Sequence, residues 1–196
     1  MREAEIKRET AETKVELTLM LEGSGTVDVC TGVGFLDHML TLFARHGRFD
    51  LRVSCSGDTG VDDHHSTEDV AICLGKAFAK ALGDCRGICR YGDCFLPMDE
   101  ALVLTAADVS GRGMCVCELP LPAQKVGTFD TELVEDFLQA FAANAGITLH
   151  VRLITGRNTH HIIEAVFKGL GRVLRQAVKI DPSAAEQIPS TKGVLQ

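Results

Sequence analysis

The sequence lacks features that would place it in several protein classes. No apolar run approaches the roughly 20 residues that a membrane-spanning helix needs, and the first residues are charged instead of forming the apolar segment of a secretory signal. Basic residues do not predominate either, because 20 Lys and Arg stand against 27 Asp and Glu and give a formal charge of -7. Nucleic acid is bound by basic faces. We therefore expect a cytoplasmic protein without a membrane or nucleic-acid partner.

The eight cysteines also lack the CxxC spacing of common zinc sites. Most of them lie inside apolar runs, so they are expected to be small buried side chains in a reducing compartment. Cys85, Cys89 and Cys94 are an alternative thiol site, although their spacing matches no usual zinc pattern. With 196 residues, of which 45% are hydrophobic, the chain is long enough for one domain or two small repeats.

A pattern of two adjacent histidines and a glutamate occurs twice. The octets DDHHSTED and NTHHIIEA begin 96 residues apart, and each is followed by a segment rich in Ala, Leu, Lys and Arg. Such composition predicts an amphipathic helix that begins at each octet. On these helices His64 and Glu68 are neighbours at i, i+4, and so are His160 and Glu164.

This repeated pattern predicts a metal site. Adjacent histidines on a helix point about 100° apart, so His64 and His65 favour two ions over one shared ion. Imidazole and carboxylate ligands without thiolate suit Mn, Fe, Zn, Ni or Co, and the sequence does not choose among them. A single copy of the pattern is more often a helix cap or a solvated face, but two copies that each open a similar helix favour metal binding.

The segments before each octet follow one order of predicted elements. In the first half, hydrophobic periodicity predicts strands at 5–9, 15–21 and 26–30 in a meander, a helix at 35–46 that ends at Gly47, and a strand at 49–55. In the second half it predicts strands at 102–109 and 114–119, a helix at 133–144 and a strand at 148–154. We expect an α+β fold made by tandem duplication of a strands-helix-strand-helix unit, with sheets packed on paired helices.

The duplication divides the chain into a first repeat at 1–86, a second repeat at 87–180 and a polar tail at 181–196. His38 and His46 lie eight residues apart on the first predicted helix, roughly on one face. Aligning this helix with its counterpart puts Asp136 opposite His38. The tail is either a frayed terminus or a functional segment.

Over essentially its whole length the chain resembles the imidazoleglycerol-phosphate dehydratases of histidine biosynthesis. The matching stretches are FLDHML, DDHHSTED, YGD with MDEAL, DVSGR, VGTFDTELVE, GRNTHHIIEAVFKGLGRVLRQA and IPSTKGVL. The resemblance implies two divalent metal ions per active site, with manganese as the expected ion. It also implies trimers that assemble into a shell of 24 subunits.

The resemblance implies two overlapping sets of site residues. The implied metal ligands are His38, His64, His65, Glu68, His160, His161 and Glu164. Asp136 is a further candidate ligand, and its alternative is a solvated helix acid or a hydrogen-bond partner of a ligand. The implied substrate-binding residues are Glu12, His38, His46, His64, Glu68, Arg90, Arg112, His160, Lys168, Ser190 and Lys192. The reaction needs a carboxylate for proton transfer, and the candidate catalytic residues are Glu12, Glu68 and Glu164. The family often has histidine where this chain has Asp136, which we expect beside His160 and His161 of its own repeat or of a neighbouring subunit.

The implied reaction removes water from D-erythro-imidazoleglycerol phosphate and gives imidazoleacetol phosphate. A metal ion on the imidazole ring favours the imidazolate, whose electrons can expel the hydroxyl group. Glu12 is the first candidate for proton transfer, with Glu68 and Glu164 as competitors, and the basic residues are expected to hold the phosphate. Two alternatives are a two-metal phosphoester hydrolase and a non-catalytic shell protein assembled by metal ions.

Overall fold

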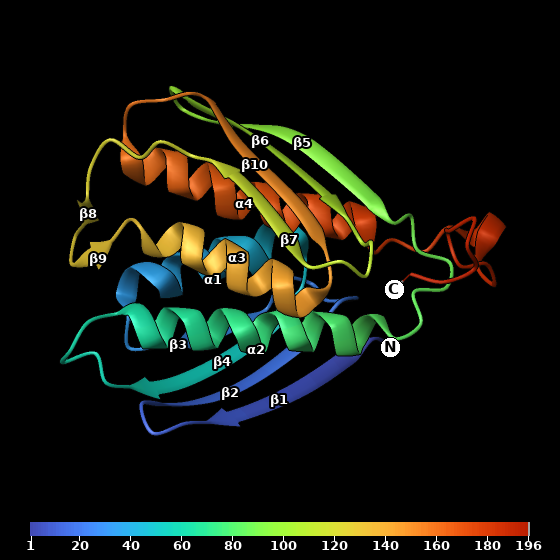
Figure 1. Ribbon diagram of the computed structural model, residues 1–196, viewed down its shortest axis with the longest axis horizontal. Coiled ribbons are helices and arrows are strands. Elements are labelled where there is room, and N and C mark those ends of the chain that lie inside the picture. Colours follow the sequence, from blue (N-terminus) through green and yellow to red (C-terminus); the bar gives the residue numbers. More distant parts are fainter. Residues whose placement is uncertain (196) are drawn as a thin grey trace.

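The computed structural model describes residues 1–195, and in this part of the chain four long helices lie between two four-stranded sheets (Figure 1). The first half of the chain contains β1 (Glu3–Glu9), β2 (Thr13–Met20), β3 (Val27–Cys30), α1 (Gly34–Gly47), β4 (Asp50–Gly57) and α2 (His64–Leu82). The second half contains β5 (Tyr91–Met98), β6 (Ala101–Asp108), β7 (Met114–Glu118), α3 (Leu133–Ala145), β10 (Thr148–Thr155) and α4 (Thr159–Ala177). A small hairpin of β8 (Lys125–Val126) and β9 (Phe129–Asp130) precedes α3, and a short 3-10 helix, η1 (Pro182–Ala184), follows α4.

The two sheets have the same topology. Their strand orders are β1-β2-β4-β3 and β5-β6-β10-β7, and in each sheet the last pair is parallel while the others are antiparallel. The expected meander of the first three strands is therefore wrong. Because α1 connects β3 to β4 across one face of the sheet, β4 returns between β2 and β3. The predicted duplication is confirmed, whereas its division at residues 86 and 180 stays a prediction.

Two local expectations also differ from the structure. The left-handed residue that ends α1 is Arg48 (φ 53°, ψ 35°) and not Gly47, which instead lies buried under the ring of Phe49. Strand β5 was not predicted, because Gly92 and Pro97 interrupt the alternation of apolar and polar residues. Proline is tolerated there because β5 is an edge strand with one unpaired side.

Each pair of packed helices takes one helix from each repeat. Helix α2 packs along α3, and α1 packs along α4. Two glycines 96 residues apart permit these close crossings. A Cβ on Gly75 would lie 2.7 Å from the carbonyl oxygen of Phe141, and a Cβ on Gly171 would lie 2.3 Å from that of Phe43. The inner faces of both sheets, with Val15, Leu17 and Leu19 in β2, complete a continuous apolar core around these helices.

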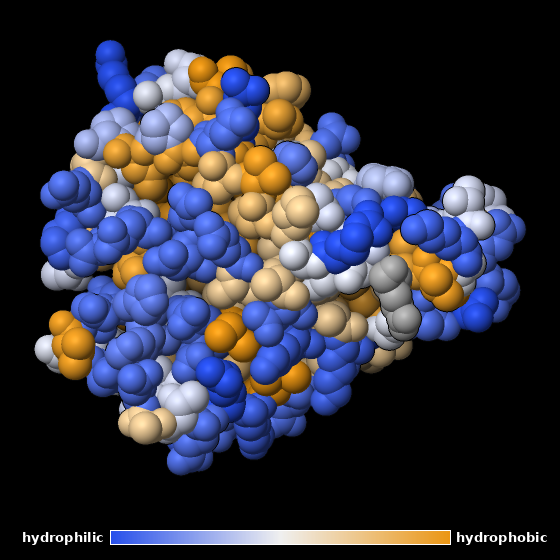
Figure 2. Space-filling model, in the orientation of Figure 1, coloured by the Kyte–Doolittle hydropathy of each residue, from blue (hydrophilic) through white to orange (hydrophobic). Residues whose placement is uncertain are grey.

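Three further features of the described residues concern the cysteines, the hydrophobic surface and membrane-spanning helices. All eight cysteines lie within the described residues and are free; Cys55 and Cys73 are buried as expected, but Cys30 and Cys89 are exposed. Hydrophobic surface is more extensive in the upper half of Figure 2, where the second sheet lies. On β5 of this sheet, Tyr91 and Phe95 are exposed. Among residues 1–195 we find no helix with the length and apolar character needed to cross a membrane.

Candidate active site

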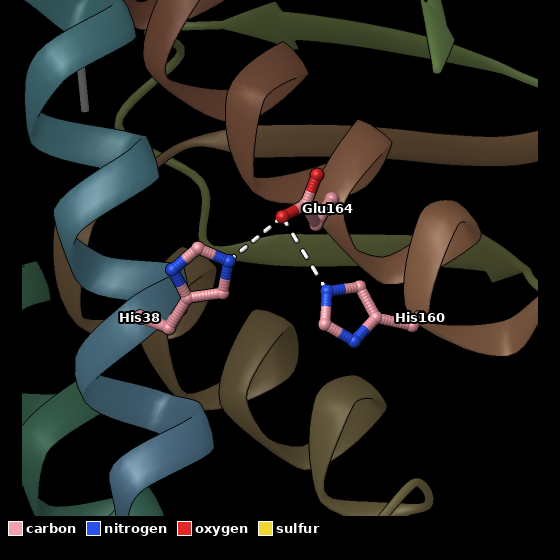
Figure 3. A group of neighbouring side chains, drawn as sticks. All are labelled: His38, His160 and Glu164. Carbon is pink, nitrogen blue, oxygen red and sulfur yellow. Dashed lines mark hydrogen bonds and ion pairs between the residues drawn. The ribbon is translucent and has the colours of Figure 1, made fainter. Parts of the chain in front are cut away.

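The crossing of α1 and α4 brings together three predicted metal ligands. The Nε2 atom of His38 lies 2.7 Å from Oε1 of Glu164, and Nε2 of His160 lies 3.4 Å from the same oxygen. Figure 3 shows the two rings converging on the carboxylate. Within residues 1–195 this is the one group of three or more potential ligands whose donor atoms all lie within 4.8 Å of one another.

The carboxylate of this group is ionised. Burial, which leaves Glu164 7% exposed, raises its pKa, but the hydrogen bonds and the charge attraction of Lys168 and His38 together outweigh burial and lower the pKa to about 2. Lys168 contributes from the next turn of α4, with Nζ 2.8 Å from Oε2. The ring of Phe35 packs edge-on against His160, with centroids 5.3 Å apart. The site therefore combines a buried anion, two imidazoles and one ammonium group.

The duplication produces a second, more open group between α2 and α3. His64, Glu68 and Asp136 line a hollow of about 510 Å³, with Nδ1 of His64 3.7 Å from Oδ2 of Asp136. The expectation that Asp136 lies beside His160 and His161 of its own repeat is wrong within this chain. The reason is the exchange of helix partners, because α3 packs on the motif helix of the other repeat.

His65 and His161 point away from both groups. The two histidines of each pair have different partners: His64 lies beside Asp136 but His65 beside Asp58, and His160 lies beside Glu164 but His161 beside Glu100. These separate partners agree with the geometry expected for adjacent helical histidines. The second histidine of each pair, His65 or His161, therefore needs another protein group to fix its orientation.

A carboxylate orients each of these two rings. Nδ1 of His65 lies 3.0 Å from Asp58, and Nδ1 of His161 lies 2.8 Å from Glu100. Each hydrogen bond raises the pKa of its histidine. The bond from His161, together with bonds from the N–H groups of Asn158 and Arg157, lowers the pKa of Glu100 to about 2. A carboxylate on one ring nitrogen leaves Nε2 available to a metal ion. The sequence analysis missed Asp58 and Glu100, although Glu100 lies in the MDEAL stretch.

Glu12 lies in the turn between β1 and β2, and its Oε2 atom is 3.7 Å from Nε2 of His65. The side chain is 54% exposed, so it is accessible to a substrate. The turn is ordered by Thr10, whose hydroxyl accepts hydrogen bonds from the N–H groups of Glu12 and Thr13. A carboxylate is thus held beside a predicted metal ligand.

Three candidate phosphate-binding residues gather at another part of the molecule. Asp108 accepts hydrogen bonds from Arg90 at 2.7 and 3.2 Å and lies 3.9 Å from Arg112. Arg90 also donates to the carbonyl oxygen of Pro189 at 2.8 Å, which brings the tail residue Ser190 to this place. The backbone of the tail is anchored here, while Lys192 is exposed and Gln196 lies outside the described residues.

Residues 31–174 match the family model described as imidazoleglycerol-phosphate dehydratase. The chain is 60% identical over 195 residues to the imidazoleglycerol-phosphate dehydratase of Azorhizobium caulinodans, covering 100% of this chain and 99% of that one. It is 59% identical over 194 residues to the one of Desulforamulus reducens, covering 99% and 98%. The chain belongs to the imidazoleglycerol-phosphate dehydratase family.

Solved structures of this family have the same fold. The dehydratase of Staphylococcus aureus superposes with a TM-score of 0.84 at 40% identity and covers 91% of this chain and 99% of its own. The dehydratase of Pyrococcus furiosus superposes with a TM-score of 0.83 at 34% identity and covers 97% and 100%. The predicted family, the duplicated α+β fold and the assignment as a lyase are therefore confirmed.

Within one chain, Lys168 does not meet the other expected phosphate-binding residues. Lys168 contacts Met98 at one end of β5, whereas Arg90 and Arg112 lie beyond the other end. The seven residue steps of β5 separate these ends by about 23 Å.

His46 lies two turns from His38, about 12 Å along α1. There it lines a different hollow with three arginines, Arg48, Arg172 and Arg175.

Proposed function

We propose that the chain catalyses the dehydration of D-erythro-imidazoleglycerol phosphate to imidazoleacetol phosphate in histidine biosynthesis. The proposal includes two divalent metal ions per active site, with manganese as the ion. The observation that carries it is the group of His38, His160 and Glu164, whose donor atoms converge inside a chain of this family. A helix cap or a solvated face does not require three such groups from two helices to meet.

The residues present suit a divalent ion. Two imidazole nitrogens and one ionised carboxylate form a nitrogen and oxygen donor set without thiolate, which suits manganese and its neighbours. His64, Glu68 and Asp136 offer a related set on the other helix pair, and His65 and His161 each keep Nε2 available. When bound, the ions would supply Lewis-acid stabilisation of the deprotonated imidazole ring.

The chain's own residues divide the remaining work. Lys168 keeps Glu164 ionised and adds positive charge beside it. Glu12 is placed beside His65, where its carboxylate can accept the carbon-bound proton of the substrate and return it at a later step. Arg112 presents an exposed guanidinium group near the tail, and such planar groups suit phosphate oxygens. Arg90 adds positive charge beside it while it donates hydrogen bonds to Asp108 and to the carbonyl oxygen of Pro189.

Self-association follows from the positions of these residues. Lys168 and the pair of Arg90 and Arg112 lie at opposite ends of β5, so a small substrate cannot contact all three within one chain. A neighbouring subunit can supply the missing group. We therefore propose an active site shared between subunits. The family resemblance implies trimers that assemble into a shell of 24 chains, and we propose this assembly for the chain.

An assay of substrate and products tests the reaction. We expect purified protein with manganese to convert the imidazole substrate to imidazoleacetol phosphate without release of inorganic phosphate, and excess chelator to abolish the conversion. A His160→Ala variant should lose activity, whereas a Glu118→Gln variant on the exposed face of β7 should keep it. Phosphate release would support a hydrolase, and bound metal without either reaction would support a shell protein.

A sizing column with elemental analysis tests the assembly. Chelation should convert a large particle into smaller units, and manganese should restore it. Neutral imidazole is the ligand form of histidine, so acidification through about pH 6 should also favour disassembly. A full-size particle that contains no metal would contradict the proposal.

A further inference from the structure

A buried aspartate at the end of the first octet, DDHHSTED, has no role in the proposed chemistry. Asp69 follows Glu68 on α2 and is 6% exposed. One of its oxygens accepts a hydrogen bond from Nε of Arg8 at 2.7 Å, and the other accepts one from the hydroxyl group of Thr13. A buried carboxylate is costly unless it is paired in this way. The two hydrogen bonds therefore allow the carboxylate of Asp69 to be buried at this position.

The two partners of Asp69 lie on either side of the turn that carries Glu12. Arg8 is near the end of β1, and Thr13 is the first residue of β2. On α2, Asp69 is four residues after His65, so both side chains lie on one face of the helix. One helix face thus presents a predicted metal ligand and also anchors the turn whose carboxylate lies 3.7 Å from that ligand.

The second repeat shows that this anchor is not required by the fold. Its residue equivalent to Asp69, 96 positions later, is Ala165, which is fully buried. The corresponding turn between β5 and β6 is held differently, because Glu100 accepts hydrogen bonds from the N–H groups of Arg157 and Asn158. The aspartate is therefore particular to the repeat whose turn bears Glu12.

We infer that Asp69 is a positioning residue, which with Arg8 and Thr13 fixes the Glu12 turn against the metal-motif helix. The inference rests on the proposed role of Glu12 in proton transfer. A displacement of about 1 Å at a reacting group costs up to about 100-fold in rate. Loss of the anchor should therefore lower kcat while leaving substrate affinity and metal content nearly unchanged.

Steady-state kinetics of the manganese-loaded assembly test the inference with a matched pair of variants. Thr13→Val removes the hydroxyl group at nearly constant shape and should lower kcat by about 10- to 100-fold, with KM within about twofold. Thr13→Ser keeps the hydroxyl group and should retain the kcat of the unmodified chain. Asp69→Ala should behave like Thr13→Val if it folds, and Thr13→Val decides the question if it does not.

A control variant separates positioning from general loss of stability. Asp50 accepts hydrogen bonds from the N–H groups of Ser24, Gly25 and Thr26, and so holds another turn of the same sheet at the opposite end of β2. Asp50→Asn should lower stability but leave kcat unchanged. An equal fall of kcat in Asp50→Asn and Thr13→Val would overturn the inference.

A double variant distinguishes failure of the inference from failure of the proposed function. Glu12→Gln alone should lower kcat by about 100-fold or more, and adding Thr13→Val to it should change kcat by less than about twofold, because the anchor acts through Glu12. If Glu12→Gln is impaired but Thr13→Val equals Thr13→Ser, Asp69 does not position Glu12 and the proposed function stands. If Glu12→Gln keeps full activity, both the role of Glu12 and this inference fall.

Discussion

Replacing Glu164 by glutamine should destabilise the metal-free protein strongly. The carboxylate is 7% exposed and contacts Nζ of Lys168 at 2.8 Å and Nε2 of His38 at 2.7 Å. Glutamine keeps the shape of the side chain but removes its charge. Lys168, whose side chain is 15% exposed, then loses its counter-charge in a largely buried place.

The pKa of Glu164 gives the expected magnitude. Burial raises this pKa, but the hydrogen bonds and the charge attraction of Lys168 and His38 together outweigh it and lower the pKa from 4.5 to about 2. One pKa unit corresponds to about 1.4 kcal/mol, so ionised Glu164 stabilises the folded protein by about 3 kcal/mol at neutral pH. This agrees with the roughly 3 to 5 kcal/mol lost when one partner of a buried ion pair is removed.

The sign of the pH dependence follows from the lowered pKa. The folded protein binds the proton of Glu164 less readily than the unfolded chain, so the stabilisation is complete above the unfolded value of 4.5. It disappears as the pH falls towards about 2. The difference between the unmodified chain and Glu164→Gln should shrink over the same range.

Urea denaturation followed by circular dichroism, in excess chelator, measures this difference. We expect about 3 kcal/mol at pH 7 and a smaller value at each step below pH 5. Glu118→Gln makes the same chemical change in an exposed ion pair with Arg152 and should cost at most about 1 kcal/mol. Equal unfolding free energies for Glu164→Gln and the unmodified chain at pH 7, or a difference independent of pH, would refute the reasoning.

Three further predictions concern the helix crossing, the orientation of a ligand and the anchoring of phosphate. Gly171→Ala should lower the unfolding free energy by about 1 to 3 kcal/mol in thermal or urea unfolding. Gly34→Ala should not, because a Cβ at position 34 meets open space. Equal effects of the two variants would contradict the close crossing. Asp58→Asn should weaken manganese binding about 10- to 100-fold in a calorimetric titration, and unchanged affinity would remove Asp58 from the support of His65. Arg90→Ala should raise KM at constant metal content, and loss of metal would assign Arg90 to the metal site instead.

Much of the candidate site was predictable because its signals are local. The two copies of the histidine pattern stand at fixed spacing in the sequence. Helical geometry alone predicted that His64 and His65 point to different places, and they contact Asp136 and Asp58, respectively. Hydrophobic periodicity located both motif helices, which begin at His64 and Thr159. Periodicity failed at β5, where glycine and proline interrupt it.

The supporting carboxylates were not predictable in the same way. Asp58 and Glu100 are hydrophilic residues in loops, and nothing in their local sequence distinguishes a ligand-orienting acid from a solvated one. Asp69 is a comparable case, because the hydrogen bond that anchors it comes from Arg8, which is 61 residues away in the chain. Such pairs exist only after distant segments have packed together.

The sequence by itself determined the duplication, the family and the chemical types of the candidate ligands, because these are properties of residue identity and spacing. Tertiary structure alone decided which ligands meet. Gly75 and Gly171 let each motif helix pack closely against a helix of the other repeat, and this exchange puts Glu164 beside His38 and puts Asp136 beside His64. The choice of helix partner depends on contacts between residues far apart in the chain, which no local pattern of the sequence encodes.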